Sequence, residues 1–242
     1  MIDGALCLAR VRLARAARDE ARLRRLYLHP DEERLAAQLR VDKRRTEFVA
    51  GRVAVKRAAR RLGLPGRPSE IAVLPDQGYR AGAPVLFDRE KLRRREPVSI
   101  SHAAGFAYAA AAPRGRLGLD VERIEPREAS FTEGAFAPGE VARWAAALGR
   151  SRGEAPIVTI AWCAKEALLK LAGVGLRAPL ESHAVQSIRW ESTPPPPEAR
   201  RLDASALAWA EIETLELGIA ELGVATQRDV ALVVVWSAAP AR

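Results

Sequence analysis

Two carboxylates on one short stretch, Leu117–Glu122, are the residues best suited to chemistry in this sequence. Apolar and polar residues alternate along the stretch, which predicts a strand with Asp120 and Glu122 on the same face, their Cα atoms about 6.5–7 Å apart. Like charges at this spacing repel one another unless they are solvated or share a cation. Hard oxygen ligands without an accompanying His or Cys suit Mg²⁺ that carries a substrate phosphate. The polar face of an exposed edge strand would explain the same pattern.

A second stretch, residues 161–170, combines a carboxylate, an ammonium group and an indole. It lacks Gly and Pro and is rich in Ala and Leu, which favours a helix. Four-residue spacing places Trp162, Glu166 and Lys170 along one side of that helix. A solvated Glu-Lys pair would explain two of these residues, but the large indole beside the carboxylate argues for a less exposed setting.

The elements that must position these residues are a mixture of helices and short strands. Helices are predicted for residues 16–28, from Pro30 onward, from an N-cap at Asp42 to Gly63, and from Pro138 onward. The predicted strands are residues 71–74, 98–102, 106–112, 117–122, 185–190, 209–217 and 230–236. Residues 125–137 are predicted to form a loop.

Composition narrows the class of protein. The chain has 242 residues, of which 48% are hydrophobic and 29% charged, and no apolar run is long enough to span a bilayer. We therefore expect no membrane association. Two cysteines, Cys7 and Cys163, form no disulfide framework, which suits a reducing cytoplasm. The net charge of +9 indicates an anionic partner: nucleic acid, a phosphorylated small molecule or an acidic protein. An Arg-rich background from a high-GC genome would produce the same charge.

Three stretches, taken together in this order, resemble the single-chain, Sfp-type 4′-phosphopantetheinyl transferases. They are Ser99–His102, Gly118–Glu122 and Trp162–Lys170, and the helix around Phe48–Lys56 matches more loosely. The resemblance implies an α+β fold of two similar halves in one chain, a pseudo-dimer, each half being a small, mainly antiparallel sheet packed with helices. We place the N-terminal half at residues 1–114, and the C-terminal half, which carries the carboxylates, at residues 115–242.

The resemblance also implies an activity. Such an enzyme transfers the 4′-phosphopantetheine arm of coenzyme A to a serine of an apo acyl carrier protein or peptidyl carrier protein domain and releases adenosine 3′,5′-bisphosphate. Asp120, Glu122 and Glu166 would hold Mg²⁺, or Mn²⁺, against the pyrophosphate. Glu166 would also be the base, directly or through a metal-bound water, and Lys170 would act with it by reaching the phosphates. The remaining contacts with coenzyme A would come from Arg52, Lys56, Ser101, His102 and Lys165.

We further expect a cytoplasmic monomer that serves lysine biosynthesis or secondary metabolism. Two residues depart from the family pattern at positions expected to face the nucleotide part of coenzyme A. Lys56 stands where the family usually has Arg, and Ala83 replaces the Lys of a frequent Gly-Lys-Pro turn. The alternative is a basic nucleic-acid-binding protein without catalysis, supported by the charge and the Arg-rich N-terminus. No nucleic-acid motif is visible, however, and aromatic residues are only 5%, too few for an obvious stacking platform.

Overall fold

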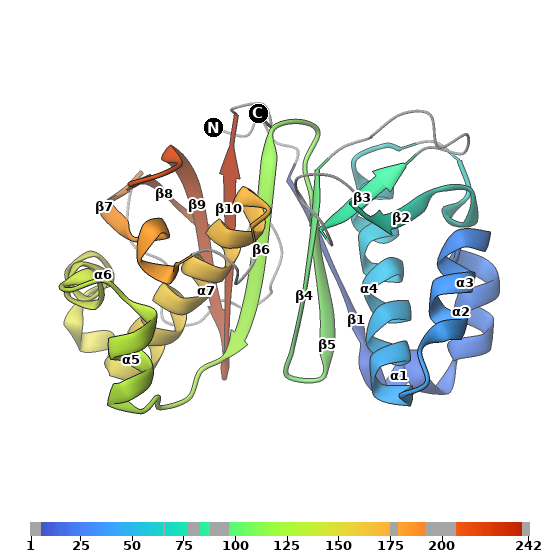
Figure 1. The fold of residues 1–242 in the computed structure, drawn as a ribbon, viewed down its shortest axis with the longest axis horizontal. Coiled ribbons are helices and arrows are strands. Elements are labelled where there is room, and N and C mark those ends of the chain that lie inside the picture. The colour runs from blue at the N-terminus through green and yellow to red at the C-terminus, as the bar shows by residue number, and fades with distance from the viewer. Residues whose placement is uncertain are drawn as a thin grey trace. The chain divides into compact units, whose positions relative to one another are not determined.

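The computed structural model describes residues 6–64, 66–76, 83–87, 97–174, 179–191 and 207–238, except for the side chain of Ser182. The chain divides into two compact units, residues 2–115 and residues 116–242. Each unit contains antiparallel strands with helices packed against them (Figure 1). The α+β class expected from the sequence, with two similar halves in one chain, is therefore confirmed.

The N-terminal unit is built on a three-stranded sheet in the order β1-β5-β4, with β2 and β3 forming a separate ladder. Its strands are β1 (Cys7–Arg12), β2 (Ala72–Pro75), β3 (Pro84–Phe87), β4 (Val98–Ala103) and β5 (Phe106–Ala111). Its helices are α1 (Leu13–Arg18), α2 (Glu20–Tyr27), α3 (Pro30–Gln38) and α4 (Asp42–Arg61), with a 3-10 turn η1 (Pro68–Glu70).

Helix α4 is the central helix of this unit. Most residues on its buried side are small, among them Val49, Val53 and Ala54, which pack with the alanines of β5 in one apolar cluster. The sequence predicts Asp42 as the N-cap of this helix, and this prediction is wrong. Val41 occupies the cap position with extended backbone, so Asp42 is the first helical residue. The Asp42 carboxylate instead accepts a hydrogen bond of 2.7 Å from Arg45.

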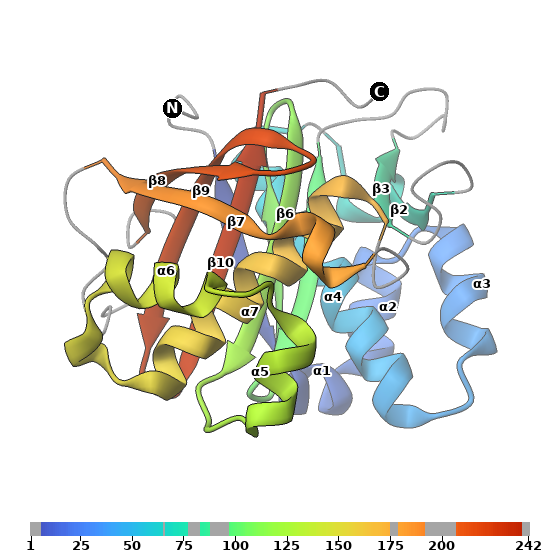
Figure 2. The same ribbon diagram turned by 60° about the vertical axis from the view of Figure 1, so that its left-hand side comes forward.

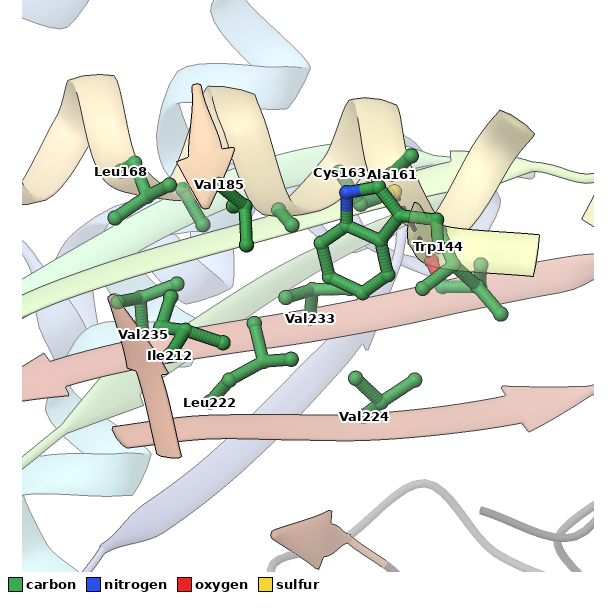
Figure 3. Close-up of a cluster of buried hydrophobic side chains, with 14 of the residues drawn as sticks. Trp144, Ala161, Cys163, Leu168, Val185, Ile212, Leu222, Val224, Val233 and Val235 are labelled. Atoms are coloured by element: carbon green, nitrogen blue, oxygen red, sulfur yellow. Dashed lines mark hydrogen bonds between the residues drawn. The ribbon is translucent and has the colours of Figure 1, made fainter. Parts of the chain in front are cut away.

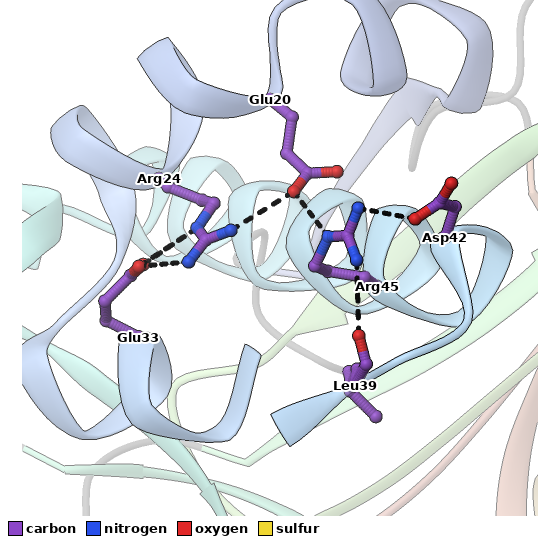
Figure 4. Close-up of polar contacts among 6 residues, drawn as sticks. All are labelled: Glu20, Arg24, Glu33, Leu39, Asp42 and Arg45. Atoms are coloured by element: carbon purple, nitrogen blue, oxygen red, sulfur yellow. Dashed lines mark hydrogen bonds and ion pairs between the residues drawn. The ribbon is translucent and has the colours of Figure 1, made fainter. Parts of the chain in front are cut away.

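Ion pairs join the helices of the N-terminal unit on their polar side (Figure 4). Arg24 contacts Glu20 on its own helix and Glu33 of α3, while Arg45 of α4 donates to Glu20 at 2.7 Å. Several of the basic residues that contribute to the charge of +9 are thus paired within the fold. For these arginines, the positive charge alone does not indicate a ligand.

The C-terminal unit contains a five-stranded antiparallel sheet in the order β6-β10-β9-β8-β7. Its strands are β6 (Arg116–Arg123), β7 (Val185–Trp190), β8 (Ala208–Thr214), β9 (Gly218–Gln227) and β10 (Val230–Ser237). Its helices are α5 (Ala129–Ala135), α6 (Glu140–Leu148) and α7 (Glu154–Ala172), with 3-10 turns η2 (Arg150–Arg152) and η4 (Leu180–His183). Helices α6 and α7 lie against one face of this sheet (Figure 2).

Two elements of the C-terminal unit differ from the sequence prediction. The predicted loop 125–137 contains the short helix α5, and strand β9 was not predicted. Gly134 and Thr132 weaken the helical signal of α5, which packs Phe131 and Ala135 against the core. Strand β9 has Gly223 in its interior, and its pairing with β8 and β10 on both sides decides its conformation.

The core of this unit lies between α7 and the sheet (Figure 3). The fully buried Trp144 of α6 packs there with Val224 and Val233 of the sheet and with Cys163 of α7. Burial raises the pKa of the Cys163 thiol well above its ordinary value of 9.0, so the thiol stays protonated. Among the described residues, no helix is long and apolar enough to cross a bilayer.

Candidate active site

The candidate site begins with the close approach of α7 to β6 at Gly118. A Cβ atom at this position would lie 1.8 Å from the Ala167 carbonyl oxygen, which is far inside van der Waals contact. Only glycine therefore allows the two backbones to approach as they do. Because side chains alternate along a strand, Asp120 and Glu122 share the face of β6 that α7 covers.

Lys170 of α7 connects the helix to this face. Its ammonium group donates to Asp120 Oδ1 at 2.7 Å and to the Leu119 carbonyl oxygen at 3.1 Å. The Asp120 side chain is almost fully buried, whereas that of Lys170 is 30% exposed. The ion pair brings together two residues separated by fifty positions in the sequence, and the predicted proximity of strand and helix is thus observed.

Two further carboxylates lie within electrostatic range of Asp120. Burial raises the pKa of Glu122, and the neighbouring charge of Asp120 raises it further, while Arg127 and Lys170 oppose the shift. Burial likewise raises the pKa of Glu166, with additional contributions from Asp120 and Glu122 and an opposing one from Lys170. The three carboxylates of Asp120, Glu122 and Glu166 thus repel one another, and an added positive charge would stabilise them. We call these three side chains together the carboxylate group.

The chemistry of this group fits a divalent cation, since all three donors are hard oxygens from two adjacent elements. In the described part of the chain, however, no three His, Cys, Asp or Glu side chains are arranged so that they could hold a metal ion. Asp120 is paired with Lys170 instead. A divalent ion and the Lys170 ammonium would therefore compete for the same carboxylate.

Residues 116–237, which include β6 and α7, match the family model described as the 4′-phosphopantetheinyl transferase superfamily. The match covers half of the chain. It contains the three carboxylates Asp120, Glu122 and Glu166, and also Lys170. The chain belongs to the 4′-phosphopantetheinyl transferase superfamily. It is accordingly a phosphopantetheinyl transferase, and the family resemblance noted in the sequence is confirmed at the level of the superfamily.

Solved structures of holo-acyl-carrier-protein synthases are also similar to parts of this transferase. One from Bacillus anthracis str. Ames, in complex with CoA (3′,5′-ADP), is 28% identical, with 44% of this chain and 92% of that chain covered and a TM-score of 0.37. The one from Plasmodium yoelii is 17% identical, with 44% of this chain and 91% of that chain covered and a TM-score of 0.37. The one from Thermotoga maritima is 21% identical, with 55% of this chain and 74% of that chain covered and a TM-score of 0.33. A comparison with curated protein sequences returned no match.

Four of the other predicted site residues of the transferase lie in the N-terminal unit, and Lys165 lies on α7 of the C-terminal unit. On β4, Ser101 is buried and His102 is exposed, with His102 Nε2 3.0 Å from the Glu47 carbonyl oxygen, a contact that places the imidazole proton on Nε2. On α4, the Arg52 guanidinium stacks over the Phe48 ring at 4.0 Å. Burial lowers the pKa of Arg52 to about 10, which leaves it charged at neutral pH.

Lys56 and Lys165, which the sequence predicts to bind coenzyme A, are both fully buried. Lys165 donates to Glu140 Oε2 and to the Leu180 carbonyl oxygen, each at 2.8 Å. Lys56 donates to Glu32 Oε2 and to the Tyr27 carbonyl oxygen, and burial lowers its pKa. Neither ammonium group is accessible to a ligand in this structure. The structure therefore supports a structural role for both lysines.

The two buried pairs have the same set of hydrogen bonds. Glu140 Oε2 also accepts from the backbone N–H three residues earlier, and Oε1 accepts from Val185 N at the start of β7. Glu32 does the same with His29 N and with Val73 N of β2. Each carboxylate thus fixes a helix start, a strand and the long helix of its unit. Each glutamate follows a proline by two positions at a predicted helix start, but no local pattern marks either one as a buried charge.

We expect Lys165→Met to lower the free energy of unfolding by about 3–5 kcal/mol, because it leaves the Glu140 charge buried without a counter-ion. Adding Glu140→Gln should recover part of this loss, since the remaining side chain is neutral. Lys56→Met is the matched case in the N-terminal unit. Urea denaturation followed by circular dichroism measures all three variants. Single-variant losses below about 1 kcal/mol, the size of a surface pair, would contradict the buried location.

A second stability effect concerns His183 of η4, which is fully buried near Lys165. Burial lowers the pKa of His183 below its ordinary value of 6.5; Glu216 opposes this shift and Lys165 adds to it. Below that ordinary value, protons bind the unfolded chain more readily than the folded one. The stabilising contribution of the neutral imidazole is therefore complete above pH 6.5 and is lost as the pH falls toward the lowered value.

We accordingly expect the free energy of unfolding to decrease more between about pH 7.5 and about pH 5.5 in the wild type than in His183→Asn. Denaturation curves at both pH values measure the difference. Because all carboxylates are common to the two proteins, their contribution cancels in the comparison. Equal decreases in the two proteins would show that His183 has no part in the pH dependence.

Proposed function

We propose that this transferase moves the 4′-phosphopantetheine arm of coenzyme A to a serine hydroxyl of an apo acyl carrier protein or peptidyl carrier protein domain. Adenosine 3′,5′-bisphosphate is the second product, and the reaction depends on Mg²⁺. The observation that carries this proposal is the group of Asp120, Glu122 and Glu166 at the contact of β6 and α7, in the part of the chain that matches the family. We also propose a monomeric, cytoplasmic enzyme of the Sfp type.

In this proposal the serine oxygen forms a bond to the β-phosphorus of coenzyme A, and the bond from that phosphorus to the departing bisphosphate breaks. Glu166 takes the serine proton, either directly or through a water molecule. Lys170 is half-buried and binds the pyrophosphate oxygens. A Mg²⁺ ion held by Asp120, Glu122 and Glu166 would neutralise the negative charge on the phosphoryl oxygens.

In the N-terminal unit, we propose that His102 and Ser101 contact the 3′-phosphate of coenzyme A, with Arg52 as an additional cation. His102 is the exposed member of this set, and Arg52 keeps its charge at neutral pH. Lys56 and Lys165 are left out because their ammonium groups are buried in ion pairs. Their place in the family motif is explained by the packing of α4 and α7.

The proposal is tested by incubating the full chain with coenzyme A, Mg²⁺ and a panel of apo carrier proteins, followed by mass spectrometry of the products. The expected result is a carrier protein heavier by one phosphopantetheine group, with no gain when EDTA is present and recovery when Mg²⁺ is added back. Absence of the mass gain from every carrier protein in the presence of Mg²⁺ would overturn the proposal.

A further inference from the structure

Arg127 is a second cation beside the carboxylate group, and no local sequence pattern marks it. It lies in the segment between β6 and α5, with Nη2 3.5 Å from Glu122 Oε2 and 3.9 Å from Glu125 Oε1. The Arg127 side chain is 22% exposed and that of Glu122 is 35% exposed. The contact is therefore partly shielded from solvent. In such a setting two charges interact more strongly than they do on an open surface.

Aromatic packing holds the Arg127 guanidinium in this position. It lies over the Phe131 ring of α5, with 5.1 Å from Cζ to the ring centroid. Phe131 in turn meets Trp162 of α7 edge to face, with 5.0 Å between the ring centroids and an interplanar angle of 71°. Trp162 lies one turn before Glu166 on the same side of α7. A chain of contacts therefore leads from Trp162 through Phe131 and Arg127 to Glu122.

The hydrogen bonds of Arg127 do not account for its position. Its contact with Glu122 is long for a charged hydrogen bond, and its buried Nε has no hydrogen-bond partner among the described residues. Packing and charge therefore keep the guanidinium beside Glu122, without a bidentate pair. Lys170 has the corresponding place beside Asp120. Each carboxylate of β6 is thus accompanied by its own cation.

We propose that Arg127 is a positioning residue of the carboxylate group: it is the counter-ion of Glu122 while no divalent ion is bound, and it competes with that ion for Glu122. This inference rests on the proposed function, because it takes Glu122 to be a metal ligand. It gives the Phe131–Trp162 stack a role in the site. That role is to hold a positive charge beside the proposed metal ligands.

The test is the affinity of the metal-free full chain for Mn²⁺ or Mg²⁺ without coenzyme A, measured by titration calorimetry. Arg127→Gln is expected to bind the ion about 3- to 10-fold more tightly, because a repelling and competing charge is removed. Arg127→Lys keeps the charge and should stay within about twofold of the wild type. Loss of packing alone has no means of increasing metal affinity, so the gain distinguishes this role from a purely structural one.

Arg123→Gln is the matched control. Arg123 is adjacent to Glu122 in sequence but alternates to the other face of β6, is 58% exposed and lies 3.8 Å from Asp229. Its replacement removes the same charge and should leave the affinity unchanged. An affinity that is unchanged or weaker in Arg127→Gln, or equally increased in Arg123→Gln, overturns the proposal.

Thermal unfolding in EDTA separates this inference from the proposed function. Without metal, Arg127→Gln should lower the melting temperature more than Arg123→Gln, because the repulsion between Glu122 and Asp120 loses its compensation. If neither the wild type nor the variant binds a divalent ion, the metal assignment fails, and the proposed competition between Arg127 and the ion fails as well. The counter-ion role then stands or falls on the EDTA result, and equal melting temperatures for the two variants refute it.

Discussion

Glu166→Gln is expected to reduce phosphopantetheine transfer by at least about 10³-fold while leaving the protein folded. The substitution removes both a metal ligand and the proposed base but keeps the shape of the side chain. In EDTA the variant should melt at a higher temperature than the wild type. The reason is that burial and the charges of Asp120 and Glu122 disfavour the ionised carboxylate, as its raised pKa shows.

Asp120→Ala provides the contrasting case at the same site. Transfer should again be lost, but the melting temperature should fall, because Asp120 is ion-paired with Lys170 and its removal leaves that ammonium without its carboxylate partner. Glu133→Gln, at an exposed position on α5, is the activity control. Mass spectrometry of the carrier protein and calorimetric melting measure both properties. Near-normal turnover of either Glu166→Gln or Asp120→Ala would falsify the metal assignment.

The second large effect is expected from Gly118→Ala. The added Cβ would lie 1.8 Å from the carbonyl oxygen and 2.7 Å from the carbonyl carbon of Ala167, so α7 must move away from β6. Overpacking against side chains typically costs about 1–3 kcal/mol, and an obstacle made of backbone should raise the loss above about 4 kcal/mol. The fraction of Gly118→Ala that still folds should also lack phosphopantetheine-transfer activity, because the displacement of α7 separates Lys170 from Asp120.

Two other glycines of the same unit serve as controls. At Gly223 a Cβ meets only side-chain atoms of Leu207 and Trp209, at 3.0–3.2 Å, so alanine should cost less there. At Gly134, within α5, nothing lies within 4 Å, and alanine should stabilise the protein by about 0.5–1 kcal/mol. Urea denaturation ranks the three variants. A Gly118→Ala loss no larger than that of Gly223→Ala would show that the approach of α7 to β6 is not constrained by this residue.

Local signals predicted much of the secondary structure and failed at specific positions. The helix of residues 161–170 and the strand of residues 117–122 were identified because each has a clear period and a uniform composition. Helix α5 and strand β9 were missed, because both contain an internal glycine and are stabilised by their neighbours. Asp42 was assigned as a cap on residue type, whereas the cap position depends on where the chain turns into the helix.

Spacing along a strand and a helix is a local property, so the amino-acid sequence is enough to identify the superfamily and to select Asp120, Glu122 and Glu166 as candidate metal ligands. The sequence did not determine the roles of the charged residues. Lys56 and Lys165 have the residue type of phosphate ligands, and only the tertiary structure places them in buried pairs with Glu32 and Glu140.

Arg127 is the opposite case: no local pattern marks it, yet folding places it beside Glu122. Charge is encoded residue by residue, but its environment is made by segments far apart in the chain. The environment decides whether a charge is solvated, paired or available to a ligand.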